Sequence, residues 1–250
     1  MLVTFLKAIP VFLAGGLLAT ATIVAHPFDR AGRFFHWCSK TWSRFILWVF
    51  RIKVKVRGWE RLSSLTRCIY VANHASWMDI PVVVASIPDE IRIVFKKELT
   101  KIPIWGWALK IGHYISIDRA RAKDAMGSLD RAAEKIKSGA SVLLFAEGTR
   151  TKDGNLQPFK RGAFALAAKS GVPIVPLTIN NSYNVLPKGS LRVRGAEVSL
   201  VLDDPIATTG ISDRDGERKL QEAVRSVIEK NFTPPGIAQR SRKGDLGKEG

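Results

Sequence analysis

The segment Ile69-Tyr-Val-Ala-Asn-His-Ala-Ser-Trp-Met-Asp79 decides the fold class of this chain. It begins with a short apolar run typical of a buried strand, passes through the polar pair Asn73-His74, and enters a helical pattern at Ser76. A strand that leads through a short turn into a helix is the repeating unit of α/β proteins. We therefore expect a sheet that places polar residues at this strand-to-helix turn.

The same alternation extends over the chain after residue 52, where β-branched runs alternate with helical patterns. It predicts an α/β domain with a single mixed, largely parallel sheet flanked by helices. The clearest helix lies at 122–138, where apolar residues recur every three or four positions and Gly139 follows as a C-terminal cap. We expect strands at 53–58, 68–73, 92–96, 113–117, 141–146, 173–179 and 191–203, and helices at 78–86, 103–111, 122–138, 160–170 and 214–231.

Three regions follow from these patterns: an N-terminal appendage at 1–52, a catalytic domain at 53–235, and a disordered basic tail at 236–250. Between Ala8 and Ala25 the appendage has no charge over 18 residues, although Pro10, Gly15 and Gly16 interrupt the run. The run fits a cleaved signal peptide, a single span with the bulk of the chain in the cytoplasm, or a hairpin that dips into one leaflet.

Residues 28–50 combine many aromatic side chains with Arg33, Lys40 and Arg44. Aromatic rings beside basic residues are typical of helices at the headgroup level of a membrane, and the alternative is a core helix. Together with the preceding apolar run, this pattern predicts an N-terminal, membrane-associated helical hairpin. The aromatic residues are Phe28, Phe34, Phe35, Trp37, Trp42, Phe45, Trp48 and Phe50.

The charge balance points to a polyanionic partner, because 39 basic and 22 acidic residues give a net charge of +17. Residues 1–60 hold nine of these basic side chains beside the most apolar stretch of the chain. That adjacency favours an anionic phospholipid membrane over nucleic acid, for which the chain has no recognisable reading motif. Cys38 and Cys68 have no Cys-x-x-Cys or Cys/His spacing, so we expect a reducing compartment and no metal site.

His74 and Asp79 are the first candidates for chemistry. On one continuous helix, side chains five positions apart diverge by about 140°. A turn between them removes that obstacle and lets Asp79 accept a hydrogen bond from one imidazole nitrogen, so that the other nitrogen can take a proton from a hydroxyl. The alternative is a capping box, in which Asp79 reaches back to a helix cap at Ser76.

The second candidate is Leu143-Leu-Phe-Ala-Glu-Gly-Thr-Arg150, an apolar strand that ends abruptly in charge. Gly148 permits close backbone approach, Arg150 offers a planar fork suited to a phosphate, and Glu147 can hold that guanidinium or bind a substrate hydroxyl. The alternative is a surface turn with a solvated ion pair. A third cluster, Lys96, Lys97 and Arg119, forms either the wall of an anion pocket or a set of solvated charges.

The fourth candidate is the apolar run Gly171–Ile179, whose prolines Pro173 and Pro176 predict a sheet edge or a strand beside a groove. Other enzyme classes lose support, since the chain has no Gly-x-Ser-x-Gly elbow, no Gly-x-x-x-x-Gly-Lys loop and no His-Glu-x-x-His pair.

In this order, the four segments resemble the conserved blocks of glycerolipid acyltransferases, specifically the bacterial 1-acylglycerol-3-phosphate acyltransferases. The likeness covers residues 55–205 and departs from the family pattern at Ala146, where the family usually has proline. It consists of Asn73-His74 with Asp79, Lys96–Leu99 through Pro103, Gly106 and Ile117–Arg119, Phe145–Arg150, and Val172–Pro176.

The resemblance implies the glycerolphosphate acyltransferase fold and an inner-membrane enzyme whose catalytic domain faces the cytoplasm. The implied reaction moves a fatty acyl group from acyl-CoA or acyl-carrier protein to the sn-2 hydroxyl of lysophosphatidic acid and gives phosphatidic acid, with no metal and no bound cofactor. His74 would be the general base and Asp79 its orienting partner. The acceptor would be bound by Lys96, Lys97, Arg119, Glu147, Gly148, Thr149 and Arg150, and the acyl groove bordered by Val172, Pro173, Ile174, Val175 and Pro176.

Two alternatives stay open at this point. A related O-acyltransferase would share all four segments but use another acceptor, such as a lyso-ornithine lipid, glycerol 3-phosphate or another lysophospholipid. A non-enzymatic protein that binds the membrane surface through its basic segments would not need His74 at all.

Overall fold

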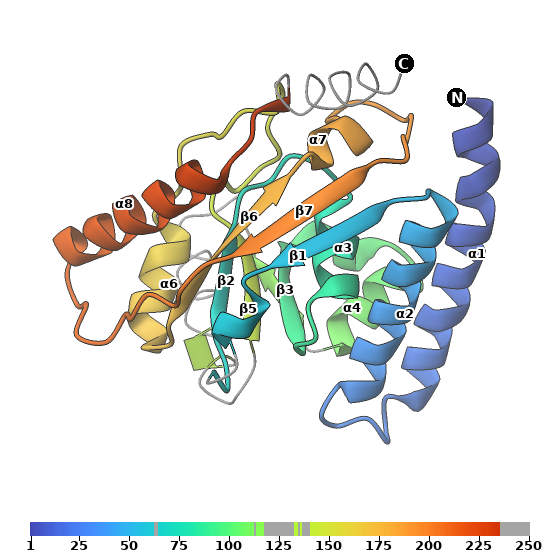
Figure 1. The fold of residues 1–250 in the computed structure, drawn as a ribbon. Coiled ribbons are helices and arrows are strands. Elements are labelled where there is room, and N and C mark those ends of the chain that lie inside the picture. The colour runs from blue at the N-terminus through green and yellow to red at the C-terminus, as the bar shows by residue number, and fades with distance from the viewer. Residues whose placement is uncertain (63–64, 113, 118–132, 135, 137–140, 236–250) are drawn as a thin grey trace, which may run out of the picture.

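The computed structural model describes residues 1–62, 65–112, 114–117, 133, 134, 136 and 141–235. Its centre is a seven-stranded sheet in the order β1-β7-β6-β2-β5-β3-β4 (Figure 1). The strands are β1 (Lys53–Arg57), β2 (Ile69–Ala72), β3 (Ile91–Lys96), β4 (Ile115–Ile117), β5 (Ser141–Phe145), β6 (Ile174–Asn180) and β7 (Glu197–Leu202). The helices are α1 (Leu2–Ala25), α2 (Arg33–Val49), α3 (Asp79–Ser86), α4 (Trp105–Ile111), α6 (Gly162–Ser170), α7 (Ser182–Val185) and α8 (Arg214–Asn231), with 3-10 turns η1 (Trp59–Leu62) and η2 (Lys97–Lys101).

The sheet is mixed and largely parallel, as predicted. Five strands, from β6 through β2, β5 and β3 to β4, run parallel to one another. At the other edge β7 runs antiparallel to β6, and β1 pairs in parallel with β7. The carboxyl ends of β2 and β5 therefore lie at the same end of the sheet, which is where sites form in α/β folds.

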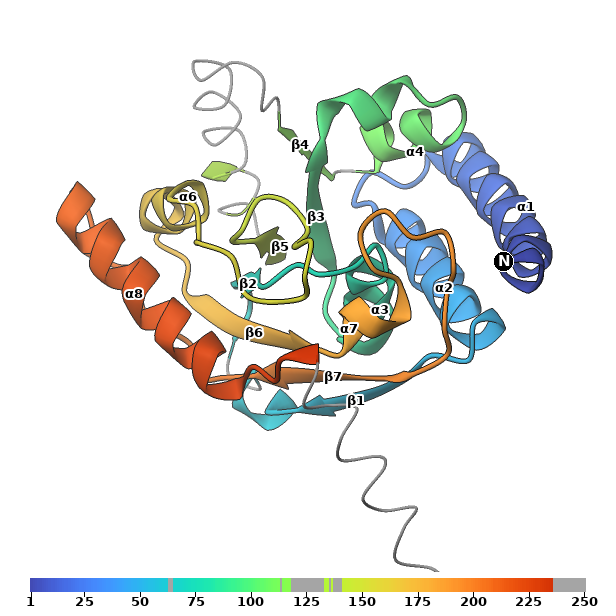
Figure 2. The same ribbon diagram turned by 90° about the horizontal axis from the view of Figure 1, so that it is seen from above.

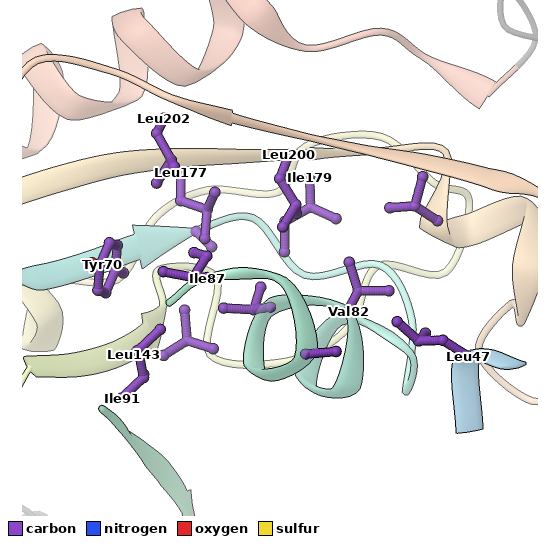
Figure 3. Packing of buried hydrophobic residues seen from close by; sticks show 14 of the residues in the cluster. Leu47, Tyr70, Val82, Ile87, Ile91, Leu143, Leu177, Ile179, Leu200 and Leu202 are labelled. Carbon is purple, nitrogen blue, oxygen red and sulfur yellow. The ribbon is translucent and has the colours of Figure 1, made fainter. Parts of the chain in front are cut away.

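Strand β2 is buried on both faces, which explains its uninterrupted apolar sequence. Ile69 and Val71 pack into one core cluster with α6 and α8, whereas Tyr70 and Ala72 pack into the cluster on the other face. Figure 3 shows Tyr70 in the second cluster, close to Ile87 and below the strands that carry Leu177 and Leu202. Each fully buried large apolar side chain contributes about 1.5–3 kcal/mol to folding, so β2 is a rigid support for the turn that follows it.

Helices cover both faces of the sheet (Figure 2). On one side α8 packs on α6 and β6 through Leu220, Val224 and Ile228, which recur every four residues along a single helical stripe. On the other side α3 packs on β1 and on α2. The boundaries predicted for α8 were correct. This amphipathic helix begins after Asp213, whose side chain accepts a hydrogen bond from the Gly216 amide at 2.7 Å.

The N-terminal residues form the predicted helical hairpin, and it is docked on the α/β domain (Figure 1). Trp42 of α2 donates from Nε1 to the carbonyl of Val11 in α1, at 2.9 Å. Lys40 donates to the carbonyl of Ile87 at 3.1 Å, and Arg92 of β3 donates to the carbonyl of Ala31 at 3.0 Å. The first bond joins α1 to α2, and the other two join the hairpin to the loop and strand that follow α3.

Helix α1 is continuous from Leu2 to Ala25 although Pro10 lies inside it. The predicted start of one strand was wrong. Strand β7 begins at Glu197 and not at residue 191, because the preceding segment follows α7, where the Arg194 amide donates to the Val185 carbonyl. The helix predicted at 122–138 falls largely outside the described residues.

The edge position predicted for the proline-containing strand was also wrong, since β6 lies between β2 and β7. The pairing of β6 with β7 ends at Leu177 and Leu202, and the next contact along β6 is an isolated bridge from Ile174 to Ile206. Pro176 lies between these two points, where the regular pairing is interrupted. There the Pro176 carbonyl accepts a bond from the Asp203 amide at 3.1 Å, so the missing proline N–H leaves no gap in a regular ladder.

Gly58 gives a direct test of the packing at the β1 edge. Its φ is +79°, and a Cβ built on it would lie 1.9 Å from the carbonyl oxygen of Leu202. Gly58→Ala should therefore lower the free energy of unfolding by about 2–4 kcal/mol. Gly162→Ala is the matched control, because nothing lies within 4 Å of its Cβ position and it begins a helix. Denaturant unfolding in mild detergent measures both; equal stability of the two variants would contradict the packing described.

Candidate active site

The site begins where β2 ends. The side chain of Asn73 continues the sheet beyond the strand: its Nδ2 donates to the Ile179 carbonyl at 2.9 Å, and its Oδ1 accepts from the Ile179 amide at 2.8 Å. This pair of bonds ties the end of β2 to β6 and fixes the direction in which the chain leaves the sheet. His74 is therefore held at a defined position at the carboxyl end of the central strand.

His74 and Asp79 meet across the turn. Nδ1 of His74 lies 2.7 Å from Oδ2 of Asp79. Since an ionised carboxylate can only accept, Nδ1 carries the proton and Nε2 is left as the basic nitrogen. Asp79 is fully buried, whereas 15% of the His74 side chain is exposed. The pair thus has its acceptor in the interior and its imidazole at the surface, as a general base that must reach a substrate requires.

The same carboxylate oxygen also organises the backbone of the turn. Oδ2 of Asp79 accepts from the amides of Ala75 at 2.8 Å and Ser76 at 2.9 Å. Ser76 in turn accepts from the Met78 amide through Oγ at 3.1 Å and donates to the Leu186 carbonyl at 2.9 Å. The predicted reach of Asp79 back to Ser76 is present together with the dyad, so the two interpretations are not exclusive. The helix itself begins at Asp79, not at Ser76.

Strand β5 and the loop after it contact the ring and the backbone of His74. The imidazole stacks on the ring of Phe145, with centroids 3.9 Å apart and planes 15° from parallel. The His74 amide donates to Oε1 of Glu147 at 2.9 Å, and the His74 carbonyl accepts from the Thr151 amide at 2.9 Å. Because β5 is the direct neighbour of β2, the second sequence candidate folds around the first.

Glu147 has a contact that the sequence did not predict. It is almost completely buried and accepts a hydrogen bond from the backbone of His74, and its binding of a substrate hydroxyl stays a prediction. Burial raises the pKa of this carboxyl to about 7, and the His74 amide partly opposes the shift. Its second oxygen has no hydrogen-bond partner among the described residues. Glu147 is therefore placed to position the turn that carries His74.

Arg150 lies over the exposed ring of Trp77, with 4.5 Å between the guanidinium carbon and the ring centroid. Burial lowers the pKa of this guanidinium, and the charge of Asp79 raises it. One of its nitrogens, Nη1, is buried without a hydrogen-bond partner in the described part of the chain. A stacked and incompletely bonded arginine fork is suited to an anionic group of a ligand.

Two lysines that the sequence did not single out as site residues join this segment. Lys188 donates to the carbonyl of Arg150 at 2.9 Å and to Oγ1 of Thr149 at 3.2 Å. The side chain of Lys160 lies so close to Gly148 that a Cβ there would be 3.0 Å from it, and Gly148 has a φ of +70°. The segment from Gly148 to Arg150 thus contains one cation, Arg150, and is flanked by two more, Lys160 and Lys188, a charge that would attract an anion.

The structure describes only some of the remaining predicted residues. Lys96 and Lys97 are at the carboxyl end of β3, where Lys97 is exposed, and Arg119 lies outside the described residues. In the segment from Val172 to Pro176, the last three residues pair with Ile69 to Val71 of β2. Val172, Ile174 and Val175 are buried in the two core clusters, so these three side chains pack in the core and not against the dyad. Within the described residues, no three His, Cys, Asp or Glu side chains gather as metal ligands.

A sequence profile described as Acyltransferase matches residues 53–180, just over half of the chain. The match includes β1 through β6 and therefore the whole turn that carries His74 and Asp79. The chain belongs to this acyltransferase family. Its predicted family resemblance and its fold class are both confirmed.

Named relatives and a solved structure agree with this membership. The chain is 37% identical to the chloroplastic 1-acyl-sn-glycerol-3-phosphate acyltransferase BAT2 of Brassica napus, over 80% of this chain and 61% of that protein. It is 30% identical to the 1-acyl-sn-glycerol-3-phosphate acyltransferase of Pseudomonas aeruginosa, over 80% of this chain and 79% of the other. The crystal structure of the 1-acyl-sn-glycerophosphate acyltransferase PlsC from Thermotoga maritima superposes with a TM-score of 0.75 and 27% identity, covering 92% of this chain and 93% of that one.

This chain spans only about 60% of the length of some plant relatives. It covers 61% of BAT2 and 56% of the Arabidopsis thaliana enzyme LPAT1. The part shared with them contains the turn and the cationic segment described above.

The raised pKa of Glu147 predicts a pH-dependent stability. The folded protein holds this proton up to about pH 7, whereas the unfolded chain releases it near 4.5. Stability should therefore fall as the pH rises from 4.5 to 7, by on the order of 3 kcal/mol from this group. Glu147→Gln keeps an oxygen for the His74 amide but cannot ionise, so it should gain stability relative to wild type between pH 5 and pH 8. Urea unfolding at both pH values measures the difference; a constant difference would contradict the assignment.

Proposed function

We propose that this chain transfers a fatty acyl group from acyl-CoA or acyl-carrier protein to the sn-2 hydroxyl of lysophosphatidic acid and so produces phosphatidic acid. The observation that carries the proposal is the His74–Asp79 pair, whose imidazole is partly exposed beside the segment that contains Arg150 and is flanked by Lys160 and Lys188. The activities in the names of the relatives support the same reaction.

In the proposed mechanism His74 acts as a general base. Nε2 takes the proton of the glycerol hydroxyl while the hydroxyl oxygen attacks the thioester carbonyl. The carbon–oxygen bond forms, the carbon–sulfur bond breaks, and the thiolate leaves with the proton that the imidazolium returns. Asp79 stabilises the imidazolium through the 2.7 Å contact with Nδ1. No acyl-enzyme forms, because the attacking oxygen belongs to the acceptor.

The acceptor's phosphate belongs, in this proposal, at the segment from Gly148 to Arg150. The incompletely bonded fork of Arg150, together with Lys160 and Lys188, would balance the charge of a phosphomonoester. Lys96, Lys97 and Arg119 stay predicted contributors to phosphate binding, as does Thr149 through its hydroxyl. Glu147 supports this arrangement indirectly, because it holds the backbone of His74.

Residues 1–52 are proposed as a membrane anchor, with the catalytic domain at 53–235 on the cytoplasmic side. Helix α1 is long and apolar enough to cross a membrane, and most of its large apolar side chains are exposed. However, α1 packs on α4 and α2 packs on α3. A spanning α1 would therefore draw the polar α/β domain toward the bilayer. This packing favours a hairpin that lies in one leaflet.

Replacement of the base gives the first test. His74→Ala should lower the rate of acyl transfer to lysophosphatidic acid by about 10²- to 10⁴-fold, because a positioned general base contributes this much. The exposed His26 offers a matched control, and His26→Ala should retain wild-type turnover. Release of coenzyme A thiol from an acyl-CoA donor in detergent micelles measures both. Unchanged turnover in His74→Ala would rule out the mechanism.

The same assay with several acceptors tests the substrate. Lysophosphatidic acid should be acylated in preference to lyso-ornithine lipid and glycerol 3-phosphate, because it combines an sn-2 hydroxyl with a phosphate and an acyl chain. If another lysolipid were consumed and lysophosphatidic acid left unchanged, the chain would be a related O-acyltransferase with the same chemistry.

A further inference from the structure

A groove with mixed chemistry lies between the start of α1, the end of α2 and the start of β1. It has a volume of about 840 Å³ and contains three cationic side chains, Lys7, Arg51 and Lys53. The groove is separate from the dyad, because β7 and β6 stand between β1 and β2 in the sheet. Its other lining residues are apolar: Val3, Leu6, Pro10, Leu47, Trp48, Val49 and Ile52.

Arg51 has an unusual backbone conformation for its residue type. Helix α2 ends in a Schellman motif, in which the Arg51 amide donates to the Trp48 carbonyl at 3.1 Å and the Ile52 amide to the Leu47 carbonyl at 2.8 Å. The motif places Arg51 at a φ of +55°, where glycine is the usual residue. Glycine would adopt this backbone conformation with less strain than arginine. Residues with strained backbone conformations are enriched at functional sites. The Arg51 side chain is therefore a candidate for a functional role.

The charge in the groove is not balanced by the described part of the protein. No ion pair there engages Lys7, Arg51 or Lys53, whereas Lys55, on the same face of β1, pairs with Glu197 at 3.1 Å. The carboxyl end of α2 carries a partial negative charge that compensates for only part of this concentration. An external anion would therefore be attracted to the groove.

The apolar part of the groove narrows the class of ligand. Leu47 and Ile52 form a buried floor, while Val3 and Trp48 stand at the rim with 65% and 75% of their surface exposed. An inorganic anion or a nucleic acid would leave this rim in contact with water. An anionic amphiphile satisfies both parts, since its phosphate can meet the cations while its hydrocarbon covers the rim.

We propose that this groove binds the headgroup of an anionic phospholipid in the membrane. The phosphate is held by Lys7, Arg51 and Lys53, and the acyl chains extend along the exposed apolar side chains of α1. The proposal rests on the proposed membrane association of residues 1–52 and does not depend on the acyl-transfer reaction. A bound headgroup at this position would fix the depth and rotation of the hairpin in the leaflet.

The test compares two double variants of the full chain. Arg51→Gly/Lys53→Gln removes two cations from the groove, and Lys55→Gln/Arg57→Gln removes the same charge from the next exposed positions of β1. Flotation with phosphatidylcholine vesicles, with and without phosphatidylglycerol, gives the preference of each protein for the anionic lipid. The groove variant should lose about 30-fold of this preference, from two headgroup contacts. The control should lose less than about threefold.

Folding and catalysis are followed on the same preparations. Because glycine relieves the backbone at position 51, the thermal midpoint of the groove variant should equal or exceed that of wild type. Acyl transfer in detergent micelles should be unchanged in both variants, and its absence from wild type would count against the proposed function alone. An unaltered lipid preference in the groove variant, or an equal loss in both variants, would overturn the lipid site.

Discussion

The turn that carries His74 depends on one carboxylate oxygen. Oδ2 of Asp79 accepts three hydrogen bonds, from Nδ1 of His74 and from the amides of Ala75 and Ser76. In its absence two buried amides would lose their partner, at a cost of about 1–3 kcal/mol each. The same oxygen sets the imidazole tautomer that leaves Nε2 basic. The same oxygen therefore both stabilises the backbone of the turn and orients the imidazole of His74.

The surroundings of this turn explain why it is rigid. Strand β2 is buried on both faces, Asn73 ties its end to β6, and Phe145 supplies a stacking surface from β5. Glu147 and Thr151 fix the backbone of His74 on both sides. The contacts to Asn73 and His74 come from β6, from β5 and from the segment that follows β5. A dyad built in this way needs little reorganisation when a substrate binds, which is what efficient general-base catalysis requires.

Local patterns in the sequence predicted the parts of the fold that depend on local physics. The alternation of strands and helices, the amphipathic α8 and the turn between His74 and Asp79 all follow from spacing and residue type. Contacts between distant segments could not be predicted in this way. Lys188 binds Thr149 across 39 positions, and Glu147 binds the His74 backbone across 73. The interior position of Pro176 likewise depends on a break in β7 pairing that only the assembled sheet provides.

The hairpin and the site are linked through the same scaffold, since α2 packs on α3, and α3 begins at Asp79. An anchored hairpin would thus hold the dyad at a fixed height relative to lipid substrates. Asp79→Asn tests the role of the Asp79 carboxylate most directly because the side chain keeps its shape. In this variant acyl transfer to lysophosphatidic acid should fall by at least about 100-fold, in a protein that still folds. Turnover within a few-fold of wild type would show that the carboxylate does not orient a catalytic His74.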